Sequence, residues 1–230
     1  MKNGSLQRES RDPSAVEVAG TAQTEAWRGD FGREYTDRNT MDVAALDALC
    51  HKRYGMSRTQ INEIFLRDIP KEASFLEVGC NTGNQLLLLR EMGYSQLSGV
   101  ELQPYALEIA RSRLTGVSLL EASASDLPHA DASFQVVFTS GVLIHIAPEN
   151  LSRALGEIHR CSRTYIWGLE YYAPEATEVN YRDHSRLLWK MDYAQRYLDL
   201  FPDLELAREK RFAYLDGPNI DAGFLLKKRR

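Results

Sequence analysis

The sequence predicts an α/β fold built on a doubly wound, mostly parallel sheet, and three observations lead to it. From Ser74 onward, short apolar-rich runs alternate with helical segments, which is the pattern of βαβ units. A glycine-containing turn at residues 79–83 follows the first of these runs. The chain closes with apolar runs around a turn signal at residues 216–219, which suits an antiparallel hairpin on an otherwise parallel sheet.

The strands are predicted from runs that are too short for helices and are bounded by polar or turn residues. Five of them form the parallel part, and three more close the chain. The parallel runs are residues 75–78, 96–100, 117–120, 134–138 and 165–169, and the closing runs are residues 204–206, 211–215 and 223–226.

The helices are predicted from apolar periodicity and from end signals such as Gly93 and Pro104. A repeat of large apolar residues that stops before Pro202 predicts the last helix. The helices cover residues 42–50, 57–65, 85–90, 104–114, 148–160 and 185–200. We expect a disordered lead-in over residues 1–22, an N-terminal helical cap over 23–70, and a core over 71–230 with a substrate-side insert at about 170–185.

Composition narrows the class of protein. The 230 residues are 43% hydrophobic and 26% charged, as in an ordinary globular domain, and the net charge of -4 predicts no nucleic-acid partner. The three cysteines are odd in number and far apart, which favours a reducing, cytoplasmic setting. No run of 18 apolar residues and no signal-peptide pattern occurs, so we expect no membrane partner and no secretion. The five histidines lack ligand spacing, so no metal site is predicted.

The turn Glu77-Val78-Gly79-Cys80-Asn81-Thr82-Gly83 stands where the first strand leads into a helix. Open α/β sheets bind ligands in the crevice at this position. A dinucleotide site would place glycine where Asn81 stands, and no Gly-Lys-Ser/Thr follows, so the turn favours a nucleoside ligand without phosphates. A plain strand-to-helix turn is the alternative.

Glu101 ends the second predicted strand, where a carboxylate can accept hydrogen bonds from the two hydroxyls of a ribose. A solvated glutamate is the alternative.

These residues carry a resemblance to class I methyltransferases that use S-adenosylmethionine (SAM). Residues 75–83 resemble their first motif and Glu101 their second, and the likeness extends over about residues 74–172. In the adenine loop, residues 122–128, Ser123 replaces the usual aspartate, so either Ser123 or Asp126 contacts the adenine amino group. The resemblance implies SAM as cofactor and a Rossmann-like, seven-stranded sheet with an antiparallel final hairpin. It implies these cofactor contacts: Tyr35, Glu77, Gly79, Cys80, Asn81, Thr82, Gly83, Glu101, Leu102, Ser123, Ala124, Ser125 and Ser140.

A narrower resemblance lies outside this core. Residues 27–39, 169–174 and 181–184 resemble methylases associated with pseudaminic acid biosynthesis, which implies a sugar acid or a nucleotide-sugar or glycan intermediate as acceptor. Arginines would pair with its carboxylate and tyrosines would offer flat faces, unless these side chains only pack the cap. The candidate acceptor contacts are Arg38, Tyr171, Tyr172, Tyr181 and Arg182, with Tyr35 beside them.

The expected reaction is transfer of the methyl group of SAM to a small, polar acceptor. It depends mainly on alignment of the reacting groups, and a hydroxyl acceptor would also need a general base. His145 is the first candidate and Glu170 the second, although a structural role for His145 is the alternative. The other functions considered are methylation of a natural product or a protein side chain, an NAD-linked oxidoreductase, and a non-catalytic SAM-fold protein that binds a partner.

Overall fold

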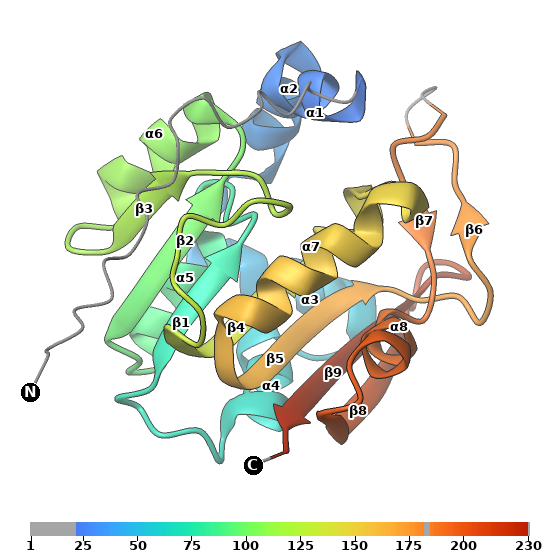
Figure 1. The fold of residues 1–230 in the computed structure, drawn as a ribbon. Helices are drawn as coiled ribbons and strands as arrows, with labels where there is room; N and C mark the ends of the chain where they lie inside the picture. The colour runs from blue at the N-terminus through green and yellow to red at the C-terminus, as the bar shows by residue number, and fades with distance from the viewer. Residues whose placement is uncertain (1–21, 182–184, 230) are drawn as a thin grey trace, which may run out of the picture.

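The computed structural model describes residues 22–181 and 185–229, and its centre is a seven-stranded sheet in the order β3-β2-β1-β4-β5-β9-β8 (Figure 1). The pairs from β3 to β5 are parallel, and β9 runs antiparallel between β5 and β8. The predicted fold class is therefore confirmed. The strands are β1 (Ser74–Val78), β2 (Gln96–Glu101), β3 (Ser118–Glu121), β4 (Phe134–Ser140), β5 (Ser162–Tyr171), β8 (Leu204–Ala213) and β9 (Ile220–Lys228), and β6 (Thr177–Glu178) pairs with β7 (Trp189–Lys190) in a separate small sheet.

Local signals define the helix ends. The Asp42 side chain accepts a hydrogen bond from the Ala45 N–H at 2.7 Å, and Ser57 forms a capping box with Gln60. Proline occupies the first turn of two helices, where its missing N–H removes no intrahelical bond. The helices are α1 (Ala22–Arg28), α2 (Asp30–Asn39), α3 (Val43–Tyr54), α4 (Arg58–Leu66), α5 (Asn84–Glu91), α6 (Pro104–Arg113), α7 (Pro148–Cys161) and α8 (Tyr193–Leu200), with a 3-10 turn, η1 (Leu143–His145).

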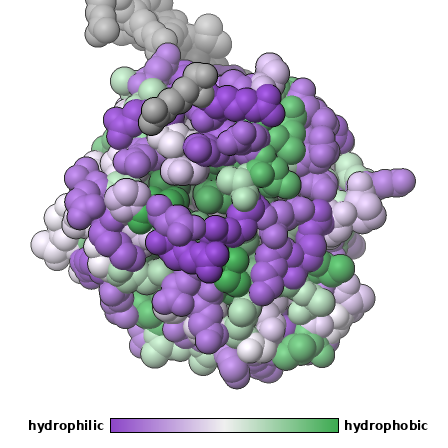
Figure 2. Space-filling model, turned by 90° about the horizontal axis from the view of Figure 1, so that it is seen from below, coloured by the Kyte–Doolittle hydropathy of each residue, from purple (hydrophilic) through white to green (hydrophobic). Residues whose placement is uncertain are grey.

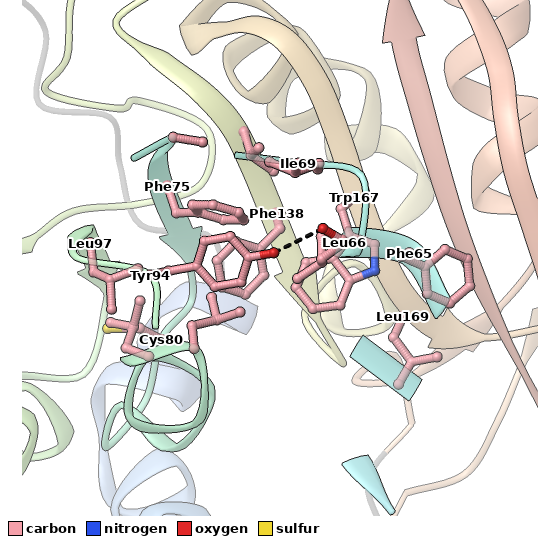
Figure 3. Packing of buried hydrophobic residues seen from close by; sticks show 14 of the residues in the cluster. Phe65, Leu66, Ile69, Phe75, Cys80, Tyr94, Leu97, Phe138, Trp167 and Leu169 are labelled. Carbon is pink, nitrogen blue, oxygen red and sulfur yellow. Dashed lines mark hydrogen bonds between the residues drawn. The ribbon is translucent and has the colours of Figure 1, made fainter. Parts of the chain in front are cut away.

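The sheet separates two hydrophobic cores, because alternate residues of its strands face opposite sides. Phe75 and Trp167 pack with α3, α4, α5 and α6, whereas their neighbours Leu76 and Ile166 pack with α7 and α8. Figure 3 shows the first core, in which the Tyr94 hydroxyl donates a hydrogen bond of 2.8 Å to the carbonyl of Leu66. Burial on both faces explains why the central strands read as short apolar runs.

Two predicted elements are wrong in extent. The helix predicted over residues 185–200 begins only at Tyr193, because Trp189–Lys190 pairs with β6 and Asp192 caps the helix by accepting from the Gln195 N–H at 3.0 Å. Leu188 and Met191 are buried although they lie in loops on either side of β7, and Trp189 is buried within β7. The runs predicted over 204–206 and 211–215 belong to one strand, β8, which ends at Ala213 and contains a bulge between Leu206 and Arg208.

The face in Figure 2 is largely hydrophilic, with apolar side chains in separate small groups. None of the helices in the described part of the chain has the length and apolar character that a membrane span needs. Among the same residues, no group of three or more His, Cys, Asp or Glu side chains is placed to hold a metal ion. The predicted lead-in falls almost wholly on residues 1–21, which lie outside the described residues.

Candidate functional site

A cavity of about 1020 Å³ runs along the carboxyl ends of the parallel strands, from β3 past β1 and β4 to β5 and the start of β9. The strand order reverses between β1 and β4, and open α/β sheets bind ligands at such a point. Figure 1 shows α1 and α2 beyond this end of the sheet. Pockets for drug-sized ligands measure about 300–1,000 Å³, so this cavity is as large as the largest of them.

Most of the predicted cofactor residues lie on the wall of this cavity, but Thr82 and Gly83 are not part of its lining. Those that line it are Tyr35, Glu77, Gly79, Cys80, Asn81, Glu101, Leu102, Ser123, Ala124, Ser125 and Ser140.

The turn after β1 needs glycine at both ends. Gly79 has a φ of +73°, and a Cβ there would lie 2.6 Å from a methyl carbon of Val142. Gly83 has a φ of +78°, and a Cβ there would lie 2.2 Å from Leu114. Larger side chains at these two positions would therefore displace the loop after β4 or the end of α6.

Asn81 occupies the middle of the turn with a φ of +45°. A hydrogen bond between its own side chain and the next residue stabilises this left-handed backbone conformation. Its Oδ1 accepts from the Thr82 N–H at 2.7 Å, which is how asparagine tolerates left-handed backbone. The Thr82 hydroxyl and carbonyl instead accept from Arg113, at 3.0 and 2.7 Å. Thr82 therefore shapes the turn from the side away from the cavity.

Glu101 is held rigidly at the end of β2. Its Oε1 accepts from the Leu102 and Gln103 N–H groups at 2.7 and 2.9 Å, and its Oε2 accepts from the Asn81 N–H at 2.7 Å. Burial raises the pKa of Glu101, and the three N–H groups oppose that rise. Because a carboxylate has about four acceptor sites, Glu101 keeps acceptor capacity on Oε2 beyond these three hydrogen bonds.

Gln103 ties the N-terminal helices to this same corner. Its side-chain amide donates to the carbonyls of Trp27, Arg28 and Gly29 at 3.1, 2.9 and 3.0 Å, at the end of α1. Arg28 also pairs with Glu121, the last residue of β3, at 3.1 Å. The helices α1 and α2 thus form a cover that is attached next to Glu101.

His145 lies on the cavity wall in η1, and its Nδ1 is 2.8 Å from the carbonyl of Leu187. Since a carbonyl only accepts, Nδ1 carries the proton, and Nε2 of the neutral ring is free to accept one. Burial lowers the pKa of His145 to about 4, against the bond to Leu187. The ring centroid lies 4.5 Å from that of Trp27 and 5.6 Å from that of Tyr181.

Glu170 is buried and lies outside the cavity lining. Its oxygens accept from the N–H groups of Val142 and Ile144 at 3.2 and 3.4 Å, so the side chain holds the loop that follows β4. Burial raises the pKa of Glu170 to about 7, against these hydrogen bonds.

The structure also brings a buried arginine, Arg58, near the predicted cofactor residue Glu77. Arg58 is buried, donates to Asn62 at 3.1 Å and to Ser140 at 2.9 Å, and forms no ion pair with a carboxylate of the described residues. Glu77 is buried, and its Oε2 has no hydrogen-bond partner among those residues. Burial raises the pKa of Glu77 well above its usual range, and the charge of Arg58 opposes that rise. In the sequence, Arg58 looks like any exposed arginine of a helix.

The predicted acceptor contacts divide between the cavity and the surface. Tyr171 and Tyr181 line the cavity. Arg38 and Tyr172 lie outside the cavity lining. Arg38 donates a hydrogen bond of 3.5 Å to Glu34, and the guanidinium of Arg211 lies 3.3 Å from the centroid of the Tyr172 ring. The remaining candidate, Arg182, lies outside the described residues. Sequence reasoning missed three residues at the β5 and β9 end of the lining, namely Arg53, Tyr54 and Asp221.

Sequence comparison relates the middle of the chain to known proteins. Residues 76–164 match the family model "Methyltransferase domain". The demethylmenaquinone methyltransferase of Chlorobaculum tepidum is 29% identical over 90 residues, which is 39% of this chain and 36% of that protein. The O-methyltransferase rstn1 of Aspergillus nomiae is 31% identical over 91 residues, 35% of this chain and 40% of that protein. The chain thus spans well under half the length of these relatives.

Solved structures match over more of the chain. The 1,6-didemethyltoxoflavin-N1-methyltransferase of Burkholderia thailandensis, solved with its substrate and S-adenosylhomocysteine (SAH), has a TM-score of 0.70 at 18% identity. It covers 94% of this chain, and the match covers 93% of that one. The [4+2]-cyclase SpnF has a TM-score of 0.60 at 17% identity, over 74% of this chain and 79% of the cyclase. At such identities the likeness is one of fold, and this fold also supports other chemistry.

Proposed function

We propose that the chain is a class I methyltransferase that transfers a methyl group from SAM to a small, polar acceptor; the match of residues 76–164 to the methyltransferase domain and the Rossmann-like sheet order support this. The observation that carries the proposal is the cavity at the switch point of the sheet, where the Gly79 turn and Glu101 meet inside the matched segment.

The residues on the cavity wall fit SAM. The free acceptor site of Glu101 Oε2 suits a ribose hydroxyl, and Ser123 and Ser125 lie by the neighbouring strand end for the adenine. The methionine end of SAM is a zwitterion: the guanidinium of Arg58 suits its carboxylate, and the unpartnered Oε2 of Glu77 can accept a hydrogen bond from its ammonium group. Gly79 lets the backbone of the turn pack against Val142 while it lines the cavity, because a Cβ at this position would collide with Val142.

The chain's contribution to the reaction is mainly positional. SAM supplies a methyl group on a positively charged sulfur. The wall residues and the cover formed by α1 and α2 hold the acceptor in line with it and exclude water. For a hydroxyl acceptor, His145 Nε2 takes the proton, since the bond to Leu187 fixes the tautomer that leaves it free.

For the acceptor, we propose a sugar acid or a nucleotide-sugar or glycan intermediate of the pseudaminic acid type. The likeness of residues 27–39, 169–174 and 181–184 to that group supports it. Tyr35, Tyr171 and Tyr181 on the cavity wall offer flat faces that suit a polar ring. The toxoflavin methyltransferase, which shares this fold, is a methyltransferase of a small molecule.

Calorimetry with SAH tests the cofactor assignment. We expect the protein to bind SAH and not NAD, and the Gly79→Val variant to lose SAH binding because its side chain would collide with Val142. Release of label from methyl-labelled SAM to a metabolite tests the reaction. Binding of SAH without any methyl transfer would favour a non-catalytic role, and binding of NAD alone would exclude the proposal.

A further inference from the structure

The cavity continues beyond the space that the proposed cofactor residues surround. Past Ser140 its wall comes from the last turn of α3, the end of β5 and the start of β9. This end is separated from Glu101 by the width of β1 and β4 in the sheet. Its polar residues are Arg53, Tyr54, Tyr171 and Asp221.

Asp221 is the fixed acceptor at this end. It is 5% exposed, and it accepts from the Tyr54 hydroxyl at 2.5 Å and from the Tyr214 hydroxyl at 3.3 Å. These two donors use only part of the acceptor capacity of a carboxylate. Burial raises the pKa of Asp221, whereas the bond from Tyr54 and the charge of Arg53 oppose the rise. Asp221 can therefore accept a further hydrogen bond from a donor in the cavity.

Arg53 supplies a positive charge beside this carboxylate. Its guanidinium carbon lies 4.9 Å from the centroid of the Tyr214 ring and 5.8 Å from that of Tyr54. No carboxylate of the described residues comes within the 4.0 Å of an ion pair with it. A planar guanidinium held by aromatic rings is suited to bind a carboxylate through two hydrogen bonds.

We infer that this end binds the methyl acceptor, with Asp221 accepting from an acceptor hydroxyl and Arg53 pairing with an acceptor carboxylate, so that the acceptor is a small hydroxy acid. The inference rests on the proposed function. Leu46, Leu49 and Leu169 line the same part of the cavity and provide apolar contact for the carbon skeleton. Asp221 and Arg53 act here as specificity residues, and the proton of the reacting hydroxyl goes to His145.

The test measures methyl transfer to the acceptor and binding of the cofactor product SAH separately. The full chain is incubated with SAM that carries a ¹⁴C-methyl group and with a small-molecule cell extract divided into anionic and neutral fractions. Arg53→Met and Asp221→Asn are compared with the wild type, and Arg163→Met is the control, because it removes an exposed arginine from the opposite end of β5. SAH affinity is measured for each protein by calorimetry.

We expect label in the anionic fraction only. Both variants should lower product formation about tenfold to a hundredfold, the range for lost charged hydrogen bonds. Their SAH affinity should stay within about twofold, and Arg53→Lys should recover part of the activity. If Asp221→Asn does not fold, Tyr54→Phe removes one bond to the carboxylate and should lower product formation several-fold.

Three outcomes would overturn the inference. They are label in the neutral fraction, unchanged product formation in both variants, and a loss of SAH affinity as large as the loss of product, which would assign this end to the cofactor. Failure of the proposed function gives a different result, since the wild type would then form no labelled product in any fraction.

Discussion

In the proposed mechanism, the carbonyl of Leu187 leaves His145 with one ring nitrogen that can accept a proton. The bond to Leu187 keeps the proton on Nδ1, and burial lowers the pKa to about 4, so the ring is neutral at physiological pH. We expect His145→Gln to lower kcat by about 10²- to 10⁴-fold with SAH affinity nearly unchanged. The activity of the wild type should be lost as the pH falls through about 4. His51→Gln, at an exposed position on α3, is the control.

Wild-type turnover in the His145→Gln variant would remove this histidine from the mechanism. A structural role alone would lower the melting temperature without changing kcat.

Glu101 carries the second prediction at the residue scale. Replacement by alanine leaves the N–H groups of Asn81, Leu102 and Gln103 without their acceptor and removes the proposed contact with the ribose. We expect SAH affinity to fall by at least about tenfold, since a hydrogen bond to a charged group contributes about 1.5–3 kcal/mol. Calorimetry with Glu101→Ala and with Glu108→Ala, an exposed glutamate of α6, provides the measurement. Equal affinities in the two variants would contradict the assignment.

The attachment of α1 gives a prediction at the scale of one element. In Gln103→Ala, the carbonyls of Trp27, Arg28 and Gly29 lose their shared donor, so α1 should detach more often. We expect faster proteolysis within α1 and α2 and faster dissociation of SAH. Gln96→Ala, at the exposed opposite end of β2, should change neither rate. Unchanged proteolysis in Gln103→Ala would mean that packing alone holds the cover.

The elements also show what could be predicted from the sequence. The parallel strands were predicted within a few residues, because both faces are buried and their apolar runs are distinct. β8 was predicted as two separate strands because it lies at the edge of the sheet, where its charged residues obscure the alternation of apolar and polar positions. The helix predicted over 185–200 was too long, because the prediction relied on the spacing of apolar residues and not on Asp192, the capping residue before its true start.

The residues of the candidate site could be predicted mainly where they stand at or just after the end of a predicted strand. The turn 79–83 and Glu101 stand at recognisable strand ends. Arg53 and Asp221 come from the end of α3 and the start of β9, and folding alone brings them to one wall.

At the scale of the whole molecule, Glu170 makes stability depend on pH. Its pKa rises from 4.5 to about 7 on folding, so the folded state binds an extra proton between these values. The resulting stability is complete below pH 4.5 and is lost as the pH rises through 7, and it amounts to about 3 kcal/mol at most. Urea unfolding from pH 4.5 to 8 should show this decline in the wild type and less of it in Glu170→Gln.

His145 contributes with the opposite sign, because its pKa is lowered on folding from 6.5 to about 4. Its share of stability is present above pH 6.5 and is lost as the pH falls toward 4. The difference between wild type and Glu170→Gln isolates the glutamate, and identical pH profiles would show that its carboxyl group titrates normally in the folded protein.

The reversed direction of β9 has a consequence for how this architecture can diversify. A parallel strand in that place would bring its last residue to the cavity, whereas β9 brings Asp221, its second residue after the short connection from β8. Exchanging residues 214–221 for the corresponding loop of another protein would therefore change which side chains line this end of the cavity, while the parallel strands kept their register.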